Sequence, residues 1–170
     1  MPKPAVTDYP EYFNRYIIQV PENDLDEALM NQSAILPGFL QSVSEQTSMH
    51  TYAEGKWTIK ELLQHIIDAE RIFDYRALCI ARKEMNSLPS FDENAYAENS
   101  YANTRDWLSL VSEFLNLRKS TRDLYASFSA EMLWHKGTAN GKIISPLSLG
   151  FITVGHFTHH KKIIEERYLT

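Results

Sequence analysis

The feature that most constrains the fold is a long apolar stripe at helical spacing, which begins at residue 58. Thr58 and Glu61 form a capping box, in which each side chain accepts a hydrogen bond from a backbone N–H of the first turn. Apolar residues then recur every three or four positions; they are Ile59, Leu63, Ile66, Phe73, Ala77 and Ile80. The pattern predicts an amphipathic helix from residue 58 to about residue 83, whose apolar face must be covered by other elements.

Three further stretches show helical periodicity. One covers residues 23–45, with a kink or a break expected at Pro37. Another covers residues 104–128. The last begins at Ser145 as the N-cap, followed by Pro146 at the first helical position, where the missing N–H costs no hydrogen bond. Four amphipathic helices, with no strand-like alternation of any length, predict an all-α four-helix bundle.

The connecting segments have their own composition. Residues 1–21 carry four prolines, and we expect them to lie across the domain as an extended N-terminal arm. Residues 84–103 predict a long loop between the second and third helices, of a length that usually covers a site or a partner surface. Residues 129–144 predict a turn-rich connection. The chain of 170 residues is long enough for one domain with a substantial core, and we predict a single domain over 1–170.

The charge and the cysteine content exclude some classes of function. The net charge is -5 and the sequence pI is about 5.7, with no cluster of Lys and Arg, which argues against a nucleic-acid surface. The single cysteine, Cys79, has no internal disulfide partner, which fits a reducing compartment. No apolar run has the length of a signal peptide or a membrane span. We therefore expect a cytoplasmic protein that binds neither nucleic acid nor membrane.

Two histidines in the last helix form a candidate metal-binding pair. His156 and His160 are four residues apart, so their imidazoles leave the same helical face, one turn from each other. That face also carries Leu149, Ile152 and Ile163, so it points toward the interior. One hypothesis is that both bind a divalent metal, with a third ligand from another helix. The alternative is that both are core histidines hydrogen-bonded to their neighbours.

The other histidines are weaker candidates from the pattern alone. His65 lies at the edge of the stripe of the second helix, where a bundle helix meets a cleft or a second neighbour. His159 is turned away from the middle of the His156 and His160 pair, which predicts a supporting or surface position. His50 and His135 fall in predicted loops and are expected to be solvated.

Two charged residues fall within apolar stripes. Glu70 lies in the stripe of the second helix and Arg118 in that of the third. Buried charges are normally paired, so we predict a buried or half-buried ion pair between them. The alternative is that one or both side chains extend outward to solvent.

Three motifs in this order resemble the DinB-like (YfiT-type) superfamily of four-helix-bundle proteins. The first is Trp57-Thr-Ile-Lys-Glu-Leu-Leu-Gln-His-Ile-Ile-Asp-Ala-Glu70, the second is the connection 137–141, and the third is Gly155-His-Phe-Thr-His-His160. The likeness covers most of the chain. It implies a metal held by one histidine of the second helix and two of the fourth, and these positions are His65, His156 and His160 here.

The resemblance also implies a chemistry. Three protein nitrogens leave one position open on a tetrahedral metal; zinc is the default, and nickel, cobalt or iron(II) suit the same ligands. Several members of the superfamily use low-molecular-weight thiols, so the resemblance suggests transfer of a thiol to an electrophilic small molecule as one hypothesis. A second is amide or ester hydrolysis, which usually needs a general base. We find no carboxylate at a secure spacing from the histidines; Asp92 and Glu93 could face a site, but solvation is the favoured interpretation. A third is a non-catalytic stress-response module that forms a homodimer.

Overall fold

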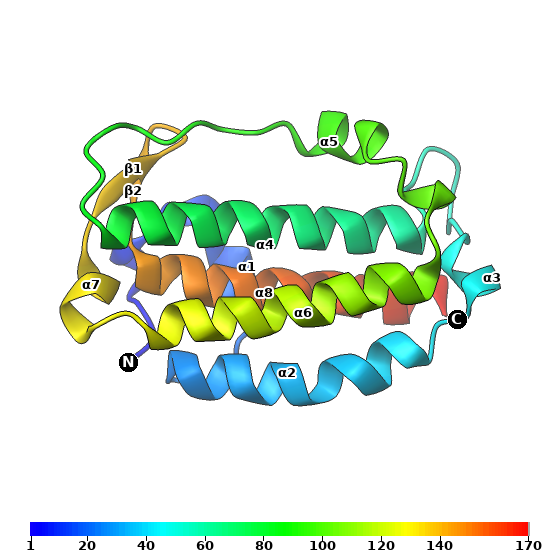
Figure 1. The fold of residues 1–170 in the computed structure, drawn as a ribbon, viewed down its shortest axis with the longest axis horizontal. Coiled ribbons are helices and arrows are strands. Elements are labelled where there is room, and N and C mark those ends of the chain that lie inside the picture. The colour runs from blue at the N-terminus through cyan, green and yellow to red at the C-terminus, as the bar shows by residue number, and fades with distance from the viewer. Residues whose placement is uncertain (170) are drawn as a thin grey trace.

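The computed structural model describes residues 1–169. Within this range, long helices lie side by side as a bundle (Figure 1): α2 (Leu25–Gln41), α4 (Ile59–Ala81), α6 (Trp107–Ala126) and α8 (Pro146–Ile163). Helix α4 packs against α6 and α8, and α2 contacts the same two helices from the other side. A π-helical turn over Ile164–Tyr168 follows α8. The predicted all-α four-helix bundle is confirmed.

The helix starts follow their local hydrogen bonds. The Thr58 hydroxyl accepts from the Glu61 N–H at 3.1 Å, and the Glu61 carboxylate accepts from the Thr58 N–H at 2.8 Å, so the predicted capping box of α4 is confirmed. The Ser145 hydroxyl likewise accepts from the Ser148 N–H at 3.1 Å, with Pro146 at the first position of α8. Both starts depend only on residues within one turn.

The predicted helix over residues 23–45 is observed as α2, which ends at Gln41 and does not break at Pro37. Helix α2 continues through Pro37 to Gln41, and Leu36 and Leu40 on either side are fully buried. Their packing holds the helix across the one backbone hydrogen bond that proline removes. A separate short helix, α3 (Glu45–Ser48), starts at Ser44, whose hydroxyl accepts from the Thr47 N–H.

The N-terminal segment crosses the bundle as predicted, but it is not extended. It consists of 3-10 turns over Val6–Asp8 and Glu11–Phe13, followed by the helical turn α1 (Asn14–Ile17). Pro2, Pro4 and Pro10 precede these turns and Pro21 follows α1, so no proline lies where a missing N–H would remove a hydrogen bond inside a helical turn. Tyr16 and Ile17 are buried, and α1 packs directly against α8.

The segment 84–103 is not a plain loop, which corrects the prediction. It contains the helix α5 (Glu93–Asn99) and a 3-10 turn over Ala102–Thr104. The Asp92 carboxylate accepts hydrogen bonds from the N–H groups of Asn94 and Ala95, and this N-cap explains why a helix forms in a polar segment. Helix α5 lies over the outer side of α4 (Figure 1).

The connection 129–144 also has regular structure that the periodicity did not predict. It contains the short helix α7 (Ala130–Trp134) and a hairpin of β1 (Gly137–Ala139) and β2 (Lys142–Ile144). Asn140 and Gly141 both have positive φ, as a tight hairpin turn requires. Leu88 exchanges two backbone hydrogen bonds with β1 and the turn, so the start of the 84–103 segment is fixed beside the hairpin.

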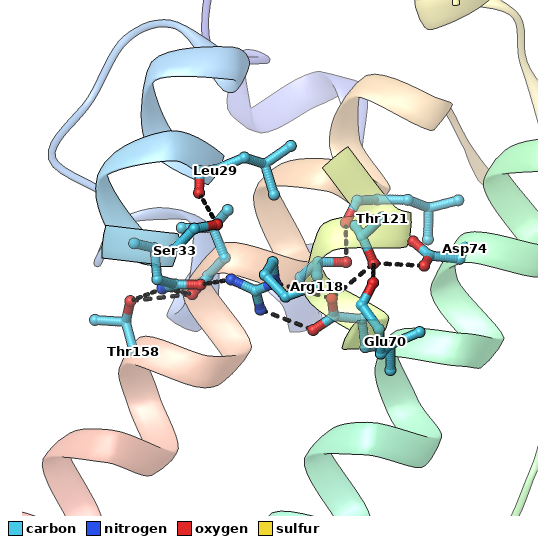
Figure 2. A network of polar contacts seen from close by, with 12 residues as sticks. Leu29, Ser33, Glu70, Asp74, Arg118, Thr121 and Thr158 are labelled. Carbon is cyan, nitrogen blue, oxygen red and sulfur yellow. Dashed lines mark hydrogen bonds and ion pairs between the residues drawn. The ribbon is translucent and has the colours of Figure 1, made fainter. Parts of the chain in front are cut away.

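A layer of polar side chains divides the core (Figure 2). Arg118 donates to both carboxylate oxygens of Glu70, from Nε at 2.8 Å and from Nη2 at 2.7 Å, and its Nη1 donates to Gln32. The Thr121 hydroxyl lies 2.7 Å from Glu70 and 2.6 Å from Asp74. Arg118 and Glu70 are buried, so the predicted ion pair is confirmed.

Gly155 allows α1 and α8 to approach closely. A Cβ at this position would overlap the main-chain carbonyl group of Tyr16. Gly155→Ala should therefore destabilise the protein by about 1–3 kcal/mol, because backbone atoms cannot rotate away as a side chain can. Chemical unfolding of the two proteins measures the difference. Gly38→Ala is the matched control, since a Cβ there meets no atom within 4 Å; equal stability of Gly155→Ala and the wild type would contradict the close approach.

Candidate metal centre

His65 comes from the second turn of α4. The capping box at Thr58 sets the start of the helix, so His65 is two turns into it and faces α8. Its side chain is buried, and the ring of Trp57 lies 5.0 Å from the imidazole, centroid to centroid. His65 therefore lies where α4 meets a second neighbouring helix, as its position at the edge of the stripe predicted.

His156 and His160 come from the buried half of α8 and the turn that follows. His156 is buried, while His160 is partly exposed. The ring of Tyr16, from α1, packs edge to face against His156 with centroids 5.2 Å apart. The close approach at Gly155 places Tyr16 there, so the N-terminal segment forms one wall of the site.

The three imidazoles converge through their Nε2 atoms. The Nε2 of His156 lies 3.1 Å from the Nε2 of His65 and 3.1 Å from that of His160. A ligand atom from each residue falls within 4.8 Å of the others. Side chains that are 91 residues apart in the sequence thus meet at one point.

Hydrogen bonds alone do not explain this arrangement. A neutral imidazole nitrogen has either one N–H or one lone pair, so the Nε2 of His156 cannot make a good hydrogen bond to both partners at once. Nitrogen ligands about 2.05 Å from a tetrahedral zinc ion are about 3.3 Å apart, close to the spacing here. The donor set therefore fits a divalent metal.

Burial keeps the three imidazoles neutral. It lowers the pKa of His65 to about 4 and, together with the charge of neighbouring histidines, lowers that of His160 to about 2. The same causes hold the pKa of His156 well below its usual value. Neutral imidazoles present lone pairs at physiological pH, and metal binding requires the neutral form.

The remaining histidines lie outside the cluster. His159 is half-buried beside Tyr16 and 3.4 Å from the side-chain amide of Gln19, which agrees with the predicted supporting or surface position. His50 is exposed, as predicted. His135 is not solvated as predicted: its Nδ1 lies 3.2 Å from the Ala81 carbonyl oxygen, and the ring is largely buried against α7 and α4.

A pocket of about 600 Å³ lies beside the cluster, and His65 and His156 line it. Five aromatic side chains give it an apolar wall; they are Tyr12, Phe13, Tyr16, Phe73 and Phe91. They come from the N-terminal segment, α4 and the 84–103 segment. These elements therefore enclose a space large enough for a small organic molecule.

The sequence-level interpretation missed most of the polar residues of the pocket. Arg76, Asn140 and Lys142 line it, and so do Asp92 and Glu93, whose side chains are exposed. For Arg76 a signal existed, because positions 65, 69, 73 and 76 follow one another along the same helical face. For the hairpin residues no local pattern pointed to a site.

A sequence profile described as the DinB superfamily matches residues 28–164. The chain belongs to the DinB superfamily. The match spans most of α2 through α8, and it includes all three clustered histidines. Among curated proteins, the search found no match.

Two solved structures share the fold of this DinB-superfamily chain. YfiT from Bacillus subtilis, described as a probable metal-dependent hydrolase with an unusual four-helix bundle topology, superposes with a TM-score of 0.70 at 19% identity, over 96% of this chain and 90% of that one. A mycothiol-dependent maleylpyruvate isomerase superposes with a TM-score of 0.64 at 17% identity, over 81% of this chain and 59% of that one. At such identities the likeness establishes the fold.

No helix within residues 1–169 of this DinB-superfamily protein has the length and apolarity needed to cross a bilayer. Within the described residues, no Asp or Glu side chain hydrogen-bonds to His65, His156 or His160. The carboxylates that share the pocket with the histidines are those of Asp92 and Glu93.

Proposed function

We propose that His65, His156 and His160 bind one divalent metal ion and that the protein is a metal-dependent enzyme acting on a small molecule. The observation that carries the proposal is the convergence of three neutral Nε2 atoms, with His156 3.1 Å from each partner, beside a pocket. Three nitrogen ligands leave a coordination position open, as catalytic sites do. Zinc is the first candidate, and nickel, cobalt and iron(II) suit the same ligands.

A bound divalent metal would supply Lewis acidity, which lowers the pKa of a coordinated thiol or water. The protein would supply the environment. The buried histidines would stay neutral, and the aromatic side chains would give the substrate an apolar contact surface. The ring of Tyr16 packs against His156, and burial raises the pKa of Tyr16, so its hydroxyl stays protonated and would act as a hydrogen-bond donor rather than as a base.

Of the two chemistries, we favour transfer of a low-molecular-weight thiol to an electrophilic substrate. This route needs no protein base next to the metal, and within the described residues no carboxylate hydrogen-bonds to the three histidines. The similarity in fold to a mycothiol-dependent isomerase supports the same choice.

Hydrolysis is the second candidate. The exposed carboxylates of Asp92 and Glu93 line the same pocket and could activate a water molecule. The similarity in fold to a probable metal-dependent hydrolase supports this route. Activity on amide or ester substrates that is lost in Asp92→Asn or Glu93→Gln, with metal content unchanged, would favour hydrolysis over thiol transfer.

Metal content tests the proposal. We expect about one metal ion per chain in protein purified without an affinity tag, and loss of that metal in His65→Ala and in His156→Ala, because each removes one of three ligands. His50→Ala, in an exposed position, is the matched control and should keep the metal. Elemental analysis measures the content, and circular dichroism checks that each variant is folded.

A second readout does not depend on turnover. Zinc at about 100 times its Kd should stabilise the chelator-treated wild type by about 2.7 kcal/mol, and the two variants should lose most of this gain. Wild-type protein that takes up no zinc or nickel would overturn the proposal. Metal removal that changes only dimerisation, with no activity toward thiols and electrophiles, would instead support a non-catalytic module.

A further inference from the structure

Arg76 is a buried cation without an acidic partner. Its side chain is 6% exposed, and no carboxylate within residues 1–169 lies within ion-pair distance of it. Its one hydrogen bond to the protein runs from Nη2 to the Pro89 carbonyl oxygen at 2.6 Å. The Cζ of Arg76 also lies 5.9 Å from the centroid of the Phe91 ring, which adds a cation–π contact. The other buried arginine of the core, Arg118, is bidentate to Glu70. Neither contact of Arg76 supplies a negative charge, and buried charges are rarely left without one, so Arg76 calls for an anionic partner.

The position of Arg76 indicates where that partner would come from. Arg76 lines the pocket that His65 also lines, and both side chains leave the same face of α4. Ala69 and Phe73 lie between them on that face and also line the pocket. The eleven residues from His65 to Arg76 span about 16 Å along the helix axis. The pocket therefore has the histidine cluster and a cation at separated points, joined by an apolar surface.

The other charged side chains of the pocket are less suited to this role. Lys142 is exposed on β2, so water already solvates its ammonium group. Asp92 is engaged as the cap of α5, and Glu93 is exposed. A ligand carboxylate at Arg76 would gain a charge-assisted contact with a guanidinium that is itself buried.

We propose that Arg76 binds the carboxylate of an elongated substrate whose opposite, reacting end lies at His65, His156 and His160 and whose middle is apolar. This inference rests on the proposed metal-dependent function, since the histidines define the reacting end. It names the substrate class: a small acid with an apolar segment, rather than a neutral molecule or a compact dianion. Arg76 acts here as a binding and positioning residue.

A set of four synthetic probes separates the two ends of the proposed substrate. One end is a hydroxamate, which chelates a metal, or an N-methylamide, which does not. The other end is a carboxylate or its methyl ester, and an alkyl chain of four to ten methylenes joins the ends. Isothermal titration of zinc-loaded protein measures each Kd. The change in Kd from N-methylamide to hydroxamate tests the metal site, and the change in Kd from methyl ester to carboxylate tests Arg76.

We expect the wild type to bind the acid about 10- to 100-fold more tightly than the ester at one preferred chain length, as for a hydrogen-bonded charge pair. Arg76→Met should lose this preference while keeping the Kd for the ester, and Arg76→Lys should retain part of it. Arg71→Met is the matched control on the same helix, because Arg71 is half-exposed, pairs with Glu113 and lies outside the pocket.

The outcomes distinguish failure of this inference from failure of the proposed function. An acid preference that persists in Arg76→Met, or that disappears in Lys142→Met instead, overturns the inference even if hydroxamates bind well. An Arg76-dependent acid preference among the N-methylamides, with no gain from the hydroxamate, keeps the carboxylate site and rejects the metal site. Equal affinity of acid and ester at every chain length in the wild type also overturns the inference. If Arg76→Met does not fold, the acid preference of Arg76→Lys is compared with that of the wild type, and an equal preference in both proteins overturns the inference.

Discussion

Arg118→Met should lower the free energy of unfolding by about 3–5 kcal/mol, because it leaves the Glu70 carboxylate buried without its partner. In the wild type the guanidinium satisfies both oxygens of Glu70, and it also donates to Gln32. Methionine fills much of the same volume, so the loss is electrostatic rather than a cavity effect. Of the substitutions considered, this one has the largest expected cost.

Urea unfolding at neutral pH measures this cost. Lys119→Met makes the same change at the adjacent exposed position of α6 and should stay within about 0.5 kcal/mol of the wild type. The double variant Glu70→Met with Arg118→Met should recover much of the loss, because removing both partners leaves no unpaired charge. A cost below about 1 kcal/mol for Arg118→Met would show that Glu70 is compensated without Arg118.

Asp74→Asn should remove a loss of folding stability that grows with pH. Burial raises the pKa of Asp74 from its usual value of 3.8 to about 7, and the charge of Glu70 adds to the effect. The hydrogen-bond geometry agrees with a protonated Asp74. The Thr121 hydroxyl lies 2.7 Å from the Glu70 carboxylate and 2.6 Å from that of Asp74, but it has only one proton to donate. A protonated Asp74 donates to Thr121, which is then free to donate to Glu70. An asparagine amide can make the same donation at every pH.

The sign of the pH dependence follows from the raised pKa. The folded state binds the Asp74 proton more tightly than the unfolded state, so this contribution is present at low pH and is lost as pH rises through about 7. Relative to Asp74→Asn, the wild type should lose about 2–3 kcal/mol between about pH 5 and about pH 8.

Denaturant unfolding of both proteins across this range gives the difference directly. The buried histidines have the opposite sign, because their lowered pKa values destabilise the fold as pH falls below about 6.5. Both proteins contain them, so their effect cancels in the comparison. Asp74→Glu is a control that keeps the carboxyl group. Parallel curves for the wild type and Asp74→Asn would contradict a protonated Asp74.

The sequence was most informative where structure depends on neighbouring residues. The starts of α4 at Thr58 and of α8 at Ser145 were correct because a cap is made within a single turn. The pairing of Glu70 with Arg118 was also correct, because two charges within apolar stripes have few other ways to be stabilised. Of the kink or break expected at Pro37, the break does not occur, since burial of the flanking leucines outweighs a local preference.

The same distinction between local sequence and tertiary packing applies to the candidate site. His156 and His160 share a face through spacing alone, and the family resemblance added His65. The convergence of their Nε2 atoms, the pocket and the isolation of Arg76 come from the packing of α1, α4, α8 and the hairpin. By itself, the sequence determined the helices and the face on which each histidine lies, because those depend on hydrogen bonds and periodicity within a few residues. Only the tertiary structure decided which side chains meet and which charges lack a partner, because those depend on distances between segments far apart in the chain.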